Sequence, residues 1–318
     1  MKILITGSAG FIGYHLSLKL LKNKNYKIIG LDSLNNYYDK KVKKKRLKIL
    51  NKNKNFFFYK INLLQKKALY NLFKRNKFDV VFHIAGQPGV LYSIKNPNSY
   101  LLNNIKATKV LSKIFKDFLI KKFVFASSSS IYGDQKKFPI SESFKPNPKN
   151  PYAKTKLESE KIVLKTFNRT RTKFIIFRFF TVYGPFGRPD MFIHKFLNSI
   201  KKNKKINIYN NGMNYRDFTY VNDVTKILDK YIKKKISHKI LNICRSKPIL
   251  TNDLIKLLIK NYPFKKKPNI KKIEFVKGEV LKTHGSNKNL QRIFGKIIFT
   301  DIKKGIKDTV KSFKIYNA

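Results

Sequence analysis

Residues 2–13 read KILITGSAGFIG, and this stretch decides the fold of the chain. Its first part, Lys2 to Thr6, is a short apolar run that predicts a buried strand. Three glycines follow at intervals of three, and a helical pattern begins at Phe11. A second predicted strand, Tyr26 to Leu31, ends at Asp32. This order of strand, glycine loop, helix, strand and acid is typical of a dinucleotide-binding unit.

Each part of this stretch has a role at a pyrophosphate. Glycines allow a tight turn and a close approach of the backbone, and the N–H groups at the start of a helix attract phosphate. A carboxylate after the second strand bonds ribose hydroxyls and disfavours a 2′-phosphate, which indicates NAD rather than NADP. We therefore expect the cofactor to contact Gly7, Gly10, Phe11, Ile12, Gly13 and Asp32.

Strands and helices alternate beyond this unit. The patterns predict strands over 55–60, 79–83, 122–127 and 173–178, and helices over 63–75 and 99–117. Such alternation predicts an α/β fold, a Rossmann-type doubly wound parallel sheet whose ligands bind beyond the carboxyl ends of the strands. Small or polar residues stand at these ends, namely Ala85, Gln87, Ser127 to Ser130 and Thr181.

The pattern loosens after about Phe180. Short strands are predicted over 206–209, 217–220, 241–243 and 272–276, with helices over 222–233 and 251–260 between them. We expect a nucleotide-binding domain over residues 1–180 and a smaller α/β substrate lobe over residues 181–318. Because no low-complexity linker separates them, we expect the two parts to be intertwined.

Tyr152 and Lys156 form the candidate acid–base pair. They stand four apart at the start of a predicted helix, so they lie one turn apart on the same face. A phenol loses its proton near pH 10, and a neighbouring ammonium lowers that pKa. The pair can therefore supply a general base near neutral pH. Ser128 ends a predicted strand and could hold or relay the proton of a substrate hydroxyl.

The composition is strongly basic. Among 318 residues, 71 are Lys or Arg and 17 are Asp or Glu, which gives a net charge of +54. The lysines are spread over the whole chain, so we expect no specific nucleic-acid or membrane partner, although the field should attract anionic ligands. The single cysteine and the spacing of the five histidines indicate no metal site. The chain shows no signal peptide or membrane span, so we expect a cytoplasmic protein.

Four motifs carry a resemblance to a known family. They are Gly7-xx-Gly10-xx-Gly13, SSSSIYG at 127–133, Tyr152-xxx-Lys156 and RFFTVYGP at 178–185. With them the chain resembles the extended short-chain dehydrogenase/reductase family. Within that family it is similar to the nucleotide-sugar epimerases, most of all to the UDP-glucuronate 4-epimerases, through DSLNNYYD at 32–39 and RDFTYVND at 216–223. The resemblance runs from Lys2 to about Phe294.

The resemblance implies a UDP-sugar epimerised at C4 through a transient 4-keto intermediate, with NAD retained and recycled. It implies that Tyr152 and Ser128 act on the sugar 4-hydroxyl and that Lys156 holds the nicotinamide ribose. Asn62 and Ala85 would complete the cofactor site. The substrate residues implied by the motifs are Gln87, Ser129, Thr181, Arg188 and Arg216. Members of the family usually pair through a four-helix interface, so a homodimer is expected through helices over 99–117 and 152–168.

Sibling activities remain to be weighed. The related 4,6-dehydratases need an acid pair after the first hydroxyl residue, and here those positions are Ser129 and Ser130. A UDP-glucuronate decarboxylase, or a 4-epimerase of another UDP-hexose, begins with the same oxidation and stays an alternative. Leu91 stands where glucuronate epimerases commonly carry an arginine. A non-catalytic NAD-binding protein that uses its charge to bind polyanions is a third alternative.

Overall fold

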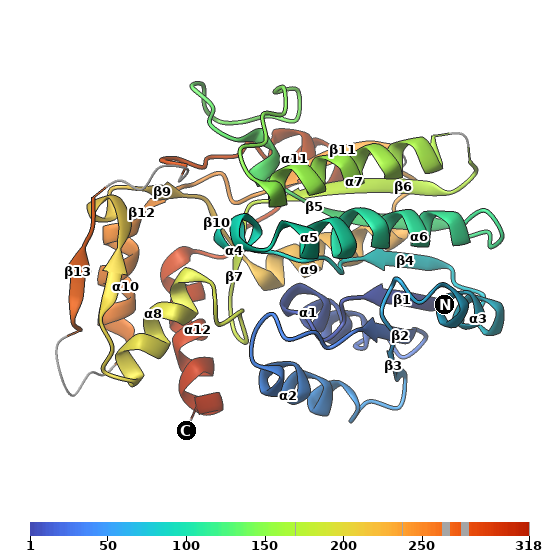
Figure 1. Cartoon of the computed structure of the whole chain (residues 1–318), viewed down its shortest axis with the longest axis horizontal. Coiled ribbons are helices and arrows are strands. Elements are labelled where there is room, and N and C mark those ends of the chain that lie inside the picture. Colours follow the sequence, from blue (N-terminus) through green and yellow to red (C-terminus); the bar gives the residue numbers. More distant parts are fainter. Residues whose placement is uncertain (169, 237, 263–267, 275–279, 318) are drawn as a thin grey trace. The chain divides into compact units, whose positions relative to one another are not determined.

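The computed structural model describes residues 1–168, 170–236, 238–262, 268–274 and 280–317. The described chain forms two compact units (Figure 1). The first unit comprises Met1–Gly133, Lys145–Phe179 and Thr225–Leu241. The second comprises Asp134–Phe144, Phe180–Val224 and the described residues from Asn242 onward. The chain therefore passes between the two units several times.

A seven-stranded sheet forms the centre of the first unit, in the order β11-β6-β5-β4-β1-β2-β3. Its strands are β1 (Lys2–Thr6), β2 (Lys27–Asp32), β3 (Phe56–Lys60), β4 (Val80–His83), β5 (Lys122–Ser128), β6 (Lys173–Phe179) and β11 (Lys239–Ile243). The neighbours from β3 to β6 pair in parallel. Because the strand order reverses beside β1, we expect a ligand to bind at the carboxyl end of β1. The predicted doubly wound α/β fold is confirmed.

Helices alternate with these strands along the chain. They are α1 (Phe11–Leu20), α2 (Lys40–Leu50), α3 (Lys66–Arg75), α4 (Val90–Lys95), α5 (Pro97–Tyr100), α6 (Ala107–Ile114), α7 (Pro151–Phe167) and α9 (Val221–Lys233). The single helix predicted over 99–117 is wrong in detail. A π-helical segment, Leu101–Lys106, separates α5 from α6, and it carries the buried Asn104, whose side chain bonds the backbone of Gln87. A pattern of apolar residues cannot predict such a wide turn.

The strand predicted over 241–243, which we expected in the smaller lobe, is divided between the two units, with Leu241 in the first and Asn242 and Ile243 in the second. It forms the end of β11, which lies at the edge of the seven-stranded sheet beside β6. The preceding helix α9 is fixed in the first unit at its C-terminus, where Lys122 Nζ donates to the carbonyls of Tyr231 and Lys234 at 3.2 and 2.8 Å. A cation at the last carbonyls of a helix is favourable, so this cap directs the chain back into the sheet.

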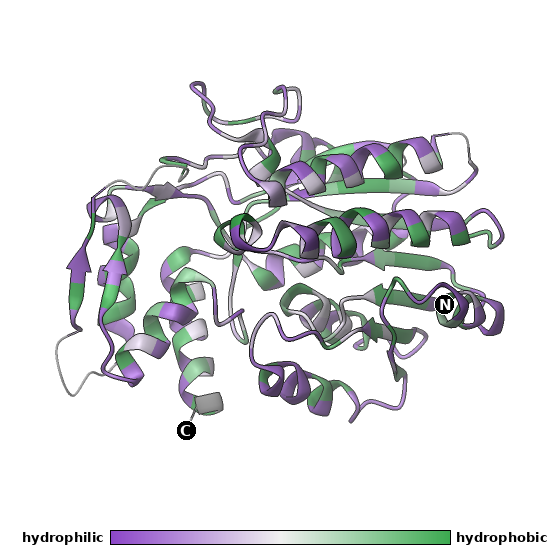
Figure 2. Ribbon diagram, in the orientation of Figure 1, coloured by the Kyte–Doolittle hydropathy of each residue, from purple (hydrophilic) through white to green (hydrophobic). Residues whose placement is uncertain are grey.

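The core of the first unit is apolar and aromatic. Leu4, Ile29, Val81 and Ile176 point from the strands into one buried cluster, and the Phe123 and Phe167 rings stack at 4.6 Å. Figure 2 shows these central strands in the green of hydrophobic residues, whereas the helices mix green with purple. The strands read as continuous apolar runs because helices cover both faces of a parallel sheet.

The second unit is built from short elements. Its strands are β7 (Thr181–Tyr183), β8 (Ile206–Ile208), β9 (Tyr215–Arg216), β10 (Phe218–Tyr220), β12 (Ile249–Leu250) and β13 (Ile270–Lys272). Its helices are α8 (Phe192–Lys201), α10 (Thr251–Asn261), α11 (Lys288–Phe294) and α12 (Ile302–Asn317). Apolar residues of β10, α8, α10 and α12 form its core. The strand predicted over 272–276 reaches only Lys272 in β13, and Phe275 and Val276 lie outside the described residues.

Candidate active site

The glycine loop between β1 and α1 has the shape that a pyrophosphate needs. Gly7 adopts a φ of +74°, and a Cβ there would lie 2.9 Å from the Cα of Ala85. A Cβ at Gly13 would lie 2.1 Å from the carbonyl oxygen of Gly7. Gly10 is the N-cap of α1 and offers no side chain to its first N–H groups, so they can receive an anion. Phe11 and Ile12 are the first two residues of that helix.

Asp32 ends β2 and is buried, with 8% of its surface exposed. Its Oδ1 accepts a hydrogen bond from the N–H of Leu34 at 2.8 Å and lies 3.9 Å from Lys43 Nζ. These contacts fix the carboxylate at the edge of the sheet beside the glycine loop. A buried carboxylate at this position fits the hydroxyls of an adenosine ribose.

The other predicted cofactor residues stand at the same edge of the sheet. Asn62 follows β3, and its Oδ1 accepts from the N–H of Leu64 at 3.0 Å. Ala85 follows β4, and its N–H donates to Thr6 Oγ1 at 3.1 Å. The carboxyl ends of the four neighbouring strands β1 to β4 thus carry, in turn, the glycine loop, Asp32, Asn62 and Ala85. The donors and the cradle of this edge fit a dinucleotide.

Helix α7 begins at the residues that carry the acid–base pair. Asn150 is its N-cap and accepts from the N–H of Ala153 at 2.9 Å, and Pro151 occupies the first helical position. Both residue types favour a helix start, which places Tyr152 in the first turn and Lys156 one turn later. The half-buried Tyr152 ring packs edge-on against Tyr100, with 6.0 Å between the ring centres.

Lys156 lies in a buried environment that lowers the pKa of its ammonium. It is buried, its Nζ donates to the carbonyl of Ala126 at 2.7 Å, and it lies 5.1 Å from the centre of the Phe125 ring. Burial lowers the pKa of Lys156 to about 8, and the nearby carboxylate of Glu160 only partly opposes this shift. Burial and the charge of Lys156 also lower the pKa of His83, to about 3, so that this imidazole stays neutral.

The serine run ends β5, and its members differ in their contacts. Ser127 donates to the carboxylate of Glu160. Ser128 is the N-cap of a short 3₁₀ helix, Ser129–Tyr132; its Oγ donates to Ser130 Oγ at 3.1 Å and accepts from the N–H of Ser130 at 3.2 Å. Because Lys156 bonds Ala126, two residues before Ser128, the structure brings these two predicted catalytic residues onto adjacent elements.

The sequence did not single out Asn104, which connects the loop after β4 to α7. Asn104 Oδ1 accepts from the N–H of Gln87 at 2.7 Å, and its Nδ2 donates to Gln87 O at 3.2 Å and Thr155 Oγ1 at 3.0 Å. Gln87 is therefore fixed beside the helix of the acid–base pair. A Cβ at the neighbouring Gly86 would lie 3.2 Å from Lys156 Nζ. No spacing in the sequence could reveal a contact between residues 51 positions apart.

Three of the predicted substrate residues belong to the second unit. Thr181 begins β7, and its N–H donates to the carbonyl of Asp217 at 3.2 Å. Arg188 forms a two-pronged pair with the carboxylate of Asp190. Arg216 donates to the carbonyls of Tyr215 and Leu281 at 3.0 and 3.1 Å. Ser129 belongs to the first unit with Gln87.

Two features bear on other classes of protein. No described helix has the length and apolar character needed to cross a membrane. In the part of the chain that the structure describes, three or more His, Cys, Asp or Glu side chains nowhere gather as a metal site.

Several UDP-glucuronate 4-epimerases are similar to this chain over nearly its whole length. A UDP-glucuronate 4-epimerase of Thermodesulfobacterium geofontis is 36% identical over 309 residues, 96% of this chain and 94% of that protein. UDP-glucuronate 4-epimerase 4 of Arabidopsis thaliana is 36% identical over 333 residues, 99% of this chain and 75% of that protein. The crystal structure of UDP-glucuronic acid 4-epimerase from Bacillus cereus with UDP-glucuronic acid and NAD matches with a TM-score of 0.93 and 31% identity, covering 99% of this chain and all of that one.

A family model, described as the NAD dependent epimerase/dehydratase family, matches residues 3–244. The match covers more than half of the chain, and with the relatives it confirms the predicted resemblance, the predicted enzyme and NAD as its cofactor. The individual site residues stay predictions. The chain belongs to the NAD dependent epimerase/dehydratase family.

Proposed function

We propose that this chain interconverts UDP-glucuronate and UDP-galacturonate by inverting C4 through a transient 4-keto sugar. The names of its relatives, UDP-glucuronate 4-epimerases that each match more than nine-tenths of the chain, support NAD-dependent epimerisation at C4 and this choice of sugar. A UDP-glucuronate decarboxylase or a 4-epimerase of another UDP-hexose shares the first oxidation and is an outcome of the test below.

The observation that carries the proposal is the buried Lys156 one helical turn from Tyr152. An ammonium in a desolvated site favours a neighbouring phenolate, because charges interact more strongly there than in water. Tyr152 can therefore take the proton of the sugar 4-hydroxyl, and Ser128 at the end of β5 can hydrogen-bond the same oxygen. When bound, NAD accepts the C4 hydride and returns it to the opposite face of the ketone.

The residues of the chain would then divide the work as follows. Tyr152 returns the proton to O4 when the hydride comes back, so the proton and the hydride balance over a cycle. Lys156 also reaches the nicotinamide ribose, while Asp32, Asn62 and Ala85 hold the rest of the dinucleotide with the glycine loop. We assign the first unit to the cofactor and the second to the nucleotide-sugar. Gln87, Ser129, Thr181, Arg188 and Arg216 are the proposed substrate contacts.

The serine run supports an epimerase over a dehydratase. Elimination of water needs an acid beside the ketone, and the residues after Ser128 are Ser129 and Ser130. Ser130 accepts a hydrogen bond from Ser128. Hydroxyl groups of this kind cannot exchange protons near neutral pH as a carboxyl pair does. The oxidised sugar is therefore expected to be reduced again.

The deciding experiment follows purified protein with UDP-glucuronate and no added NAD by proton NMR. We expect UDP-galacturonate from the unaltered protein and, for Tyr152→Phe, a rate lower by about 10²- to 10⁴-fold, the usual effect of losing a general base. The NAD content of Tyr152→Phe, measured after denaturation, should be unchanged.

Tyr70→Phe is the matched control, because Tyr70 lies on α3 with 42% of its surface exposed and loses the same hydroxyl. Its turnover should equal that of the unaltered protein. Net release of CO₂ would identify a decarboxylase instead. Full activity of Tyr152→Phe would show that another group is the base, and tight, salt-sensitive DNA binding without turnover of any UDP-sugar would favour the polyanion-binding alternative.

We also propose a cytoplasmic homodimer that supplies surface-polysaccharide synthesis. Its interface would use α7 and the helical segment of α5, Leu101–Lys106 and α6. Leu101 and Leu102 are 45% and 38% exposed, which favours burial against a second copy. Small-angle scattering at micromolar protein should give the mass of two chains, and the mass of one chain would contradict the interface.

A further inference from the structure

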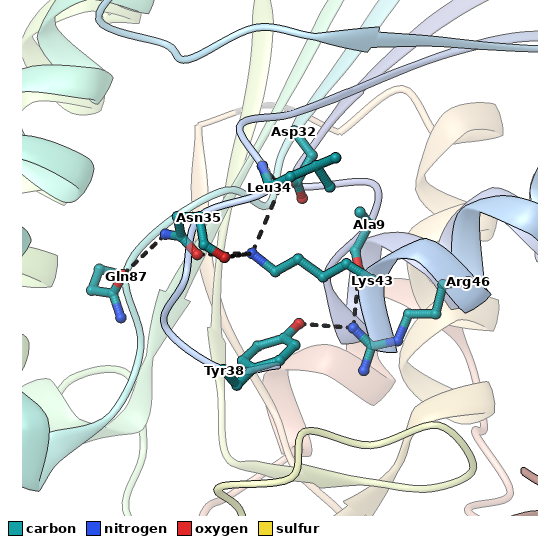
Figure 3. Close-up of polar contacts among 8 residues, drawn as sticks. All are labelled: Ala9, Asp32, Leu34, Asn35, Tyr38, Lys43, Arg46 and Gln87. Carbon is teal, nitrogen blue, oxygen red and sulfur yellow. Dashed lines mark hydrogen bonds and ion pairs between the residues drawn. The ribbon is translucent and has the colours of Figure 1, made fainter. Parts of the chain in front are cut away.

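Asn35 links two loops at the cofactor edge of the sheet (Figure 3). It lies in the loop after β2, and its Nδ2 donates to Gln87 Oε1, in the loop after β4, at 3.3 Å. On the other side Lys43 Nζ donates to Asn35 Oδ1 at 2.8 Å and to the carbonyl of Asn35 at 3.2 Å. Lys43, Asn35 and Gln87 therefore form a continuous polar chain, which we call the loop bridge.

The order of the strands puts this bridge across the carboxyl end of β1, where the cofactor is expected. β1 lies between β2 and β4, so a contact between the loops that follow β2 and β4 spans the end of β1, where the glycine loop begins. Asp32 stands at the β2 side, and Gly86 approaches Lys156 at the β4 side. A dinucleotide that reaches from Asp32 to Lys156 must pass the bridge.

Both ends of the bridge are fixed. Only 5% of the Lys43 surface is exposed, and its ammonium lies 3.9 Å from Asp32. Burial lowers the pKa of Lys43, and the charge of Asp32 opposes that shift in part. At the other end the backbone of Gln87 is held on both its N–H and its carbonyl by Asn104.

A second contact joins the same two loops. The Tyr37 ring packs edge-on against Tyr92 of α4 with 5.0 Å between the ring centres. Its hydroxyl comes so close to Gly89 that a Cβ there would lie 2.1 Å from it. The loops after β2 and β4 are thus joined by the Asn35–Gln87 hydrogen bond and by the Tyr37 ring. A larger residue at Gly89 would clash with the Tyr37 hydroxyl.

We propose that the loop bridge closes over the bound dinucleotide and slows its release, so that Lys43, Asn35 and Gln87 are positioning residues for a retained cofactor. The inference rests on the proposed assignment of this edge of the sheet to NAD. An epimerase must receive the same hydride back, so the cofactor has to outlast many cycles. A bridge between two amide side chains, anchored by the buried Lys43, can restrain departure without taking part in the hydride transfer.

The test measures the release of NAD without any sugar. Holoenzyme is mixed with excess deuterium-labelled NAD, and the replacement of bound NAD is followed by mass spectrometry after rapid desalting. Asn35→Ala and Gln87→Met should each release NAD about fivefold faster, the effect of one hydrogen bond between neutral groups. Lys43→Met should release it about tenfold faster, because a charged donor is lost.

The double variant Asn35→Ala/Gln87→Met separates the bridge from two independent effects. If the residues act through each other, the double variant stays near fivefold, whereas independent effects would multiply to about 25-fold. Lys44→Met on the exposed side of α2 is the matched control and should keep the rate of the unaltered protein. Thermal melting of the NAD-free variants shows whether the fold is intact.

Unchanged release in all three single variants, or multiplying effects in the double variant, would overturn the bridge. These outcomes leave the epimerase assignment standing, since exchange is measured without substrate. An unaltered protein that takes up no labelled NAD and contains none would instead overturn the assignment of this edge of the sheet to NAD.

Discussion

Two neighbouring turns of α7 each carry a buried charged side chain, but the partners of these side chains differ. In the earlier turn, Lys156 Nζ donates to the neutral carbonyl of Ala126, and burial lowers the pKa of Lys156 to about 8. In the next, Glu160 accepts from Arg178 Nε and Nη2 at 3.0 and 2.7 Å and from Ser127. The Glu160 carboxylate raises the pKa of the Arg178 guanidinium. The Lys156 ammonium, which donates to a neutral carbonyl, can support a neighbouring phenolate, whereas the Arg178 guanidinium is held in an ion pair with Glu160.

This difference has a physical cause in the two partners. A carboxylate and a guanidinium fit each other in a planar fork, and both lose water together, so the pair is stable only as a pair. An ammonium that donates to a neutral carbonyl loses its hydration, and the interaction with the carbonyl does not fully offset that loss. Burial therefore lowers the pKa of Lys156 to about 8, whereas the Glu160 carboxylate raises the pKa of Arg178.

The largest effect is expected from removing the Lys156 charge. Lys156→Met should lower the turnover number by about 10²- to 10⁴-fold, because the Tyr152 phenolate loses its support. The NMR assay measures this loss, and thermal melting should show a fold that is intact or more stable, since an unpaired buried charge has gone. A variant with normal turnover would contradict the assigned role.

The same residue predicts a pH dependence. Below about pH 8 Lys156 is protonated and supports the phenolate, and above it the charge is lost. We therefore expect kcat/KM of the unaltered enzyme to fall above about pH 8. Lys156→Arg keeps its charge to much higher pH, so its residual activity should lack this alkaline limb. An identical limb in both proteins would assign the titration to another group.

The next largest effect concerns the paired turn. Glu160→Gln leaves the buried guanidinium of Arg178 without a counter-ion and should lower the free energy of unfolding by about 3–5 kcal/mol. Glu158→Gln is the matched control, because Glu158 pairs with Lys161 on the exposed face of the same helix. Its cost should stay below about 1 kcal/mol. Urea unfolding of the NAD-free proteins measures both, and equal costs would refute the distinction between the two turns.

The smallest effects are expected at Ser127 and Ser128, at the end of β5. Ser127→Ala removes a bond to Glu160 and should lower the free energy of unfolding by about 1–3 kcal/mol with little change in turnover. Ser128→Ala should instead lower turnover about tenfold, and the loss of its cap bond to the Ser130 N–H should lower the free energy of unfolding by only about 0.5–2 kcal/mol. Comparing NMR rates with melting curves separates them. A reversal would move the substrate contact to Ser127.

The sequence predicted the local elements proposed for the cofactor, but it did not predict the side-chain contacts that join distant elements. The glycine loop, Asp32 and the start of α7 depend on neighbours within a few residues, so local chemistry is enough to place them. Asn104, Lys43 and Asn35 act through partners on other elements, and composition offers no signal for them. The π-helical segment that carries Asn104 was not predicted either, because nothing in the regular apolar pattern marks the interruption.

By itself, therefore, the sequence determined the α/β class, the dinucleotide unit and the residue types of the acid–base pair, because these follow from periodicity and from turn and cap chemistry. Only the tertiary structure decided which serine is bound to Glu160, that Lys156 is desolvated, that β11 closes the sheet and that Asn35 meets Gln87. Burial and long-range pairing arise when distant segments exclude water together, and a pattern read along the chain does not contain that information.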